Sequence, residues 1–90
     1  MLDYDKYDYI IKECKELSIS KNNDYGTDSL TKFGINGIII RLYDKIERLI
    51  NLSYRNKKIN VSSEKIEDTL KDIINYSIYS IMLERNELLK

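Results

Sequence analysis

The chain has 90 residues, with one cysteine, no histidine and no proline, and its 15 basic residues balance its 15 acidic residues. Without histidine or a second cysteine, serine–histidine and cysteine–histidine catalytic pairs are excluded and a zinc site is disfavoured. Balanced charge provides no electrostatic footprint for nucleic acid.

A single small domain, residues 1–90, is expected from this length, and its core is marginal because a short chain buries a small share of its surface. The longest apolar runs have four residues or fewer, which excludes a transmembrane helix. The N-terminus has no basic and apolar signal segment. We therefore expect a cytoplasmic protein without membrane or nucleic-acid partners.

The first predicted helix covers residues 3–19. Its apolar residues recur at helical spacing and form one stripe: Tyr7, Ile10, Ile11, Cys14 and Leu17. Cys14 lies on this stripe, so we expect a buried thiol and not a reactive one. The polar stretch KNNDYG, residues 21–26, predicts a turn because Asn, Asp and Gly favour turn conformations.

A second helix is predicted for residues 35–54, and a third begins at Ser62 or Ser63 as N-cap and continues to about Leu88. Within the third helix, residues 73–83 are apolar nearly all the way round, which predicts burial on every side. Two companion helices cannot surround such a helix. We expect an all-α bundle of three main helices completed by homo-oligomerisation, with a monomer that exposes an apolar patch as the alternative.

Charged residues border the apolar faces of the second and third helices. On the second helix they share one side by their spacing: Arg41, Asp44, Lys45 and Arg48. On the third helix Asp68 and Asp72 are one turn apart and repel each other unless a cation lies between them. That cation is either a facing arginine or lysine, or a bound Mg²⁺. The set forms either a salt-bridge layer or a binding surface.

Three segments together resemble the first type of the nucleotide-modification-associated domain family of phages and bacteria: KNNDYG, GINGIIIRLYDKIERLINL and IEDTLKDIINYSI. The resemblance covers about residues 17–82 and implies that the protein handles nucleotides. The family's signature positions fall on Lys21, Asp24, Tyr25, Gly26, Arg41, Asp44, Lys45, Arg48, Asp68, Asp72, Asn75 and Tyr76.

The first hypothesis is a nucleotide-binding protein that needs no cofactor. Its cations would meet phosphates, a tyrosine would stack on a base or ribose, and its aspartates would accept hydrogen bonds from the ligand. The ligand-binding residues predicted on this basis are Lys21, Asp24, Tyr25, Arg41, Asp44, Lys45, Arg48, Asp68, Asp72 and Tyr76. A compact phage protein of this kind would sequester a host immune nucleotide signal in the host cytoplasm, as an anti-defence sponge.

Two alternatives stay open. The chain is also similar to all-helical nucleotide pyrophosphohydrolases of the MazG type, which hold Mg²⁺ against a triphosphate with acids on two helices. That similarity implies a metal set of Asp44, Glu47, Asp68 and Asp72, although these residues depart from the usual motif spacing. The second alternative is a structural helical interaction module in which the charges are bridges between helices.

Overall fold

The computed structural model describes residues 1–55 and 63–90, apart from the side chains of Tyr25, Tyr54, Arg55, Ser63 and Glu64. Its elements in chain order are α1 (Tyr4–Tyr25), α2 (Asp28–Thr31), α3 (Gly34–Ile50), the π-helical turn η1 (Asn51–Arg55) and α4 (Ser63–Glu84). The described residues contain no strand. The predicted all-α class and its three main helices are confirmed.

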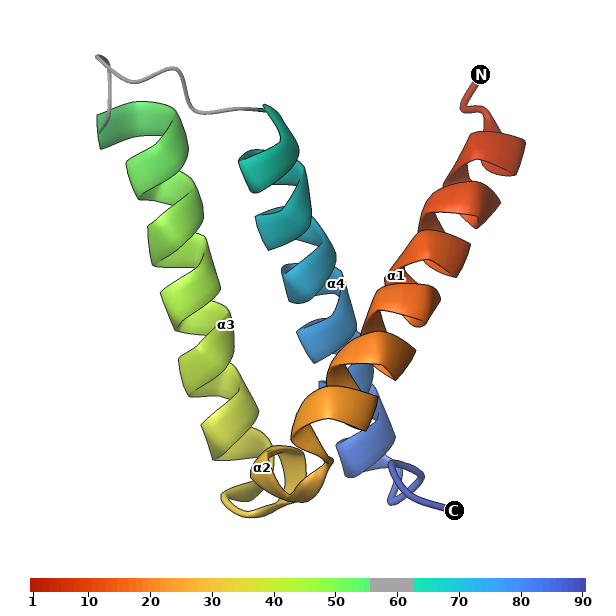
Figure 1. Cartoon of the computed structure of the whole chain (residues 1–90), viewed down its shortest axis with the longest axis vertical. Coiled ribbons are helices and arrows are strands. Elements are labelled where there is room, and N and C mark those ends of the chain that lie inside the picture. The colour runs from red at the N-terminus through yellow and green to blue at the C-terminus, as the bar shows by residue number, and fades with distance from the viewer. Residues whose placement is uncertain (56–62) are drawn as a thin grey trace.

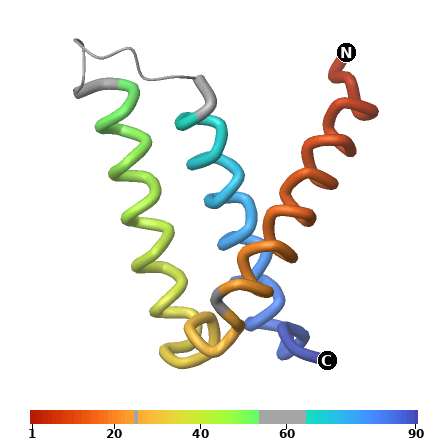
Figure 2. The backbone as a smooth tube through the Cα atoms, in the orientation of Figure 1, coloured from red at the N-terminus to blue at the C-terminus, as the bar shows by residue number. Residues whose placement is uncertain are grey.

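The most extensive packing in the described chain joins α3 and α4, which lie side by side and run in opposite directions (Figure 1). Helix α1 crosses α4, and its polar contacts with α4 run from the middle of the helix to its C-terminal end, from Glu13, Cys14, Ser18 and Lys21. The N-terminal turns of α1 lean away from α4 (Figure 2). The bundle is therefore closed near α2 and open at the other end.

The turn predicted for KNNDYG is wrong, because residues 21–25 form the last turns of α1. Only Gly26 leaves the helix, at φ 75°, and its amide donates a 2.8 Å hydrogen bond to the Asn22 carbonyl. Asn and Asp have low helix propensity, but tertiary contacts routinely override that weak preference. Here the side chains of Lys21 and Asn22 form hydrogen bonds with α4. These bonds stabilise the helical conformation of residues 21–25.

Other boundaries also differ from the prediction. The second helix ends at Ile50 and gives way to η1, and the short α2 was not predicted. Helix α4 ends at Glu84, before Leu88, because Asn86 adopts φ 56° and its amide bonds to the Leu83 carbonyl. The Glu87 amide bonds to the Met82 carbonyl, which completes a Schellman motif. The N-cap predicted at Ser62 or Ser63 falls outside the described residues and side chains.

The apolar core of the described chain is small. Its buried members are Cys14, Leu30 and Ile38, each no more than 6% exposed. The Cys14 thiol is buried as predicted, and this burial raises its pKa, so it stays neutral at physiological pH. The chain alone does not bury the apolar segment of α4 on every side, since Ile78 is 38% and Ile81 53% exposed.

None of the helices in the described ranges is long and apolar enough to cross a membrane.

Gly26 provides a test of how α1 ends. Its φ of 75° and ψ of 178° are accessible almost exclusively to glycine, while an added Cβ would meet no atom within 4 Å. We therefore expect Gly26→Ala to lower the free energy of unfolding by about 1 to 3 kcal/mol through backbone strain alone. Urea denaturation measures this change. The control Ser20→Ala, at an exposed helical position of α1, should change stability by no more than about 0.5 kcal/mol.

Candidate functional site

A polar cleft of about 510 Å³ lies where α1, α3 and α4 meet beside α2. Its charged walls are Lys21 from the end of α1, Arg41 from α3 and Asp72 from α4. Tyr76 and Tyr79 of α4 provide the aromatic part of the lining. All three long helices are therefore needed to form the cleft.

Asp72 is the charged centre of this region. Its Oδ1 lies 2.6 Å from Lys21 Nζ and its Oδ2 lies 2.9 Å from Lys45 Nζ, and its side chain is only 11% exposed. Burial by itself would raise the pKa of Asp72. The hydrogen bonds and charges of the two lysines outweigh burial, and the pKa is lowered overall. The carboxylate is thus held ionised, with both oxygens occupied.

Arg41 contributes a second positive group to the cleft. Its guanidinium lies over the ring of Tyr76, with Cζ 6.0 Å from the ring centroid, which is within the range of a cation–π contact. In the part of the chain that the structure describes, no carboxylate pairs with Arg41. Lys21 and Arg41 therefore line the cleft beside the single carboxylate of Asp72, which Lys45 also pairs with from outside the cleft, and positive charge is in excess.

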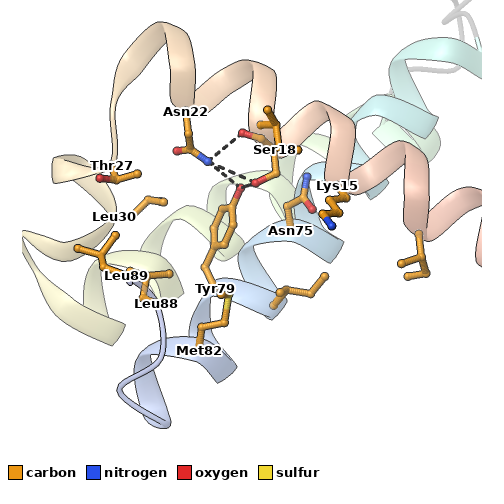
Figure 3. A pocket seen from close by; sticks show the side chains of 13 residues that line it. Lys15, Ser18, Asn22, Thr27, Leu30, Asn75, Tyr79, Met82, Leu88 and Leu89 are labelled. Carbon is orange, nitrogen blue, oxygen red and sulfur yellow. Dashed lines mark hydrogen bonds between the residues drawn. The ribbon is translucent and has the colours of Figure 1, made fainter.

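Tyr79 separates the polar cleft from an apolar one. Its hydroxyl hydrogen-bonds to Ser18 Oγ and accepts from Asn22 Nδ2 at 3.3 Å, so that the ring lies between α1 and α4 (Figure 3). The second cleft, about 420 Å³, has apolar walls that include Ile19, Met82 and Leu88. The two clefts share the walls Asn22, Leu30, Asn75 and Tyr79.

Asn75 lines both clefts and connects α4 to α1. It is 6% exposed, and its Nδ2 donates a 3.0 Å hydrogen bond to the Cys14 carbonyl in the middle of α1. A carbonyl inside a helix already accepts one backbone bond and can accept a second. This bond fixes the point along each helix, Cys14 on α1 and Asn75 on α4, at which the two helices cross.

The structure gathers half of the predicted site residues. Lys21, Arg41, Lys45, Asp72 and Tyr76 lie together, although Lys45 reaches Asp72 from outside the cleft. Four of the other five do not line the cleft: Asp44 and Arg48 line a separate, more open depression on α3, and Asp24 and Asp68 are exposed. The side chain of the fifth, Tyr25, is not described.

The four acids of the alternative metal set are spread out. Asp72 is occupied by two lysines, whereas Asp44 and Glu47 line the other depression and Asp68 is exposed. Among the residues that the structure describes, no group of three or more acidic or cysteine side chains lies close enough together to hold a metal ion.

Sequence reasoning missed the polar contacts made by Ser18, Asn22 and Tyr79. Asn22 was assigned to turn chemistry, yet its side chain bonds to the Ser18 carbonyl at 2.9 Å and to Tyr79. The available signal was the i, i+4 spacing of Ser18 and Asn22, which places both on one helix face. That signal was lost because the first helix was predicted to end at residue 19.

These features define a small all-helical protein in which lysines from two helices hold a buried carboxylate beside a polar cleft. Residues 21–83 match the family model described as nucleotide modification associated domain 1, and the chain belongs to this family. The resemblance noted in the sequence is thereby confirmed. Comparison with curated proteins and with solved structures gave no match.

The Asp72 ion pairs predict a pH dependence of stability. Because the pKa of Asp72 is lower in the folded chain than its ordinary value of 3.8, the pairs stabilise the fold above that value. This stabilisation is lost as the pH falls through the folded pKa. At pH 7, Asp72→Asn should lower the free energy of unfolding by about 1.5 to 3 kcal/mol, the range for hydrogen bonds to charged groups.

Urea denaturation of the wild type and Asp72→Asn between pH 7 and pH 2 measures this difference, which should shrink below about pH 4. Asp68→Asn is the matched control, since it removes an exposed aspartate one turn away on the same helix. A difference that persisted unchanged at pH 2 would show that Asp72 stabilises the chain by packing and not by its charge.

Proposed function

We propose that this protein binds a phosphate-containing nucleotide in the polar cleft and holds it without chemical change. The observation that carries the proposal is the excess of positive charge around Asp72, from Lys21, Lys45 and Arg41, next to a pair of tyrosine rings. Membership of a family described as nucleotide modification associated adds a general link to nucleotides.

The cations suit a phosphate. Arg41 has a planar guanidinium that can donate two parallel hydrogen bonds to phosphate oxygens. Lys21 keeps 47% of its side chain exposed while it pairs with Asp72, so a ligand can share its ammonium group. An ammonium group has three donors, and one aspartate oxygen occupies only one of them.

The tyrosines suit the rest of a nucleotide. The rings of Tyr76 and Tyr79 meet edge to face, with centroids 6.0 Å apart and an interplanar angle of 81°. A base or ribose can lie against such rings, whose faces are apolar and whose hydroxyls are polar. The apolar cleft on the other side of Tyr79 offers further space for the base of a nucleotide whose phosphate is bound at Arg41.

The state of Asp72 supports binding in preference to catalysis. A general base near neutral pH needs a raised pKa, whereas the pKa of Asp72 is lowered. Both of its oxygens are held by lysines, so neither is free to coordinate a metal. We therefore propose sequestration, in its most specific form the capture of a host immune nucleotide signal by a phage-encoded protein.

A ligand-dependent melting screen tests the proposal. Cyclic dinucleotides, ADP-ribose derivatives and nucleoside mono-, di- and triphosphates are each added with Mg²⁺ and with a chelator. A ligand at a hundred times its Kd adds about 2.7 kcal/mol, which raises the Tm by roughly 10 °C or more for a chain of this size. The bound ligand should be recovered unchanged on chromatography. No shift with any nucleotide contradicts the proposal, and chelator-sensitive turnover would indicate the hydrolase instead.

Arg41→Ala tests the site itself. Loss of charge-assisted hydrogen bonds worth about 1.5 to 3 kcal/mol should weaken binding by roughly 10- to 100-fold, measured by calorimetry with the best ligand of the screen. Arg48→Ala is the control, because Arg48 is an exposed arginine of the same helix that lines the separate depression. Equal losses in the two variants would place the ligand outside the cleft.

A further inference from the structure

The side of the α3/α4 pair that faces away from the cleft is apolar and uncovered. Its most exposed large side chains form what we call the outer face: Ile35, Ile39, Tyr43 and Ile46 of α3 with Leu70 and Ile81 of α4. Each is between 40 and 66% exposed, although all are large apolar or aromatic residues.

Helical geometry places these residues on one side. At 100° per residue, Ile39 and Tyr43 lie about 160° around α3 from Arg41, and Leu70 and Ile81 lie about 160 to 180° around α4 from Asp72. Arg41 and Asp72 line the same cleft and so point to one side of the helix pair. The residues nearly half a turn away on both helices therefore point together to the opposite side.

A single copy of the chain does not account for this surface. Only Cys14, Leu30 and Ile38 are buried apolar residues in the described chain, which is a small core for a domain of this length. At this exposure the six large side chains leave on the order of several hundred Å² of apolar surface in contact with water. Ile35 of α3 and Ile81 of α4 line one shallow depression, so the apolar stripes of the two helices meet there. Exposed apolar patches of that size are often contact sites, and a standard interface takes about 800 Å² from each partner.

We propose that the outer face packs against the outer face of a second copy, so that two α3/α4 pairs form a four-helix bundle with the polar clefts on its outside. A two-fold axis brings the same apolar stripe onto itself, which an antiparallel helix pair permits. The formal net charge is zero, so two copies do not repel each other at long range. Glu67 and Glu84, the acids on this side, lie near the two ends of α4.

Sedimentation equilibrium of the full chain tests the proposal. We expect a mass of twice 10.7 kDa and a Tm that rises with protein concentration. Ile39→Lys should reduce the mass to that of one chain, because the charge would be buried at the centre of the interface. Tyr7→Lys is the control on another exposed apolar surface, the N-terminal half of α1, and should leave the mass unchanged.

Three results would overturn the inference: a single-chain or three-chain mass for the wild type, a dimer that Ile39→Lys leaves intact, or one that only Tyr7→Lys dissociates. Should Ile39→Lys fail to fold, Ile39→Ala decides the matter. Ile39 is 52% exposed in one chain, so a monomer tolerates this change. Packing across the proposed interface instead predicts a dimer Kd raised at least tenfold, and an unchanged Kd contradicts it.

Discussion

The carboxylate of Asp72 holds lysines from two other helices, Lys21 of α1 at 2.6 Å and Lys45 of α3 at 2.9 Å. A carboxylate that is almost fully buried is costly unless opposite charges and hydrogen bonds compensate it. The two lysines provide this compensation, and their positions are constrained in return. These two ion pairs therefore connect all three long helices through one residue and gather positive charge at the cleft.

The end of α1 follows from the same contact. Lys21 reaches Asp72 only if the helix continues past residue 19, and the extra turn also brings Asn22 to the hydroxyl of Tyr79. These bonds outweigh the low helix propensity of the Asn and Asp residues in KNNDYG. Gly26 then ends the helix with a backbone conformation that other residues rarely adopt. The segment is both a helix terminus and one wall of the cleft.

Helix α1 is joined to α4 largely by polar contacts, whereas larger bundles join their helices mainly by apolar packing. Three contacts lie between these helices: the Asn75 bond to the Cys14 carbonyl, the Lys71–Glu13 ion pair, and the hydrogen bonds of the Tyr79 hydroxyl with Ser18 and Asn22. Such contacts are directional, and they define where the helices cross. Helix α1 covers only one side of the α3/α4 pair, and on the other side the outer face stays exposed in a single copy, where the proposed second copy would cover it.

The sequence by itself determined the helical class, the three main helices, the buried position of Cys14 and the family, because these depend on local periodicity and on short motifs. It also placed Arg41, Asp72 and Tyr76 near one another, since their spacing puts each on an inward side of its helix. Only the tertiary structure decided that Lys21 extends α1 and that Asp44 and Arg48 lie apart from the cleft. Helix ends and cleft walls depend on contacts between residues some fifty positions apart, such as Lys21 and Asp72, and local propensity carries no information about those contacts.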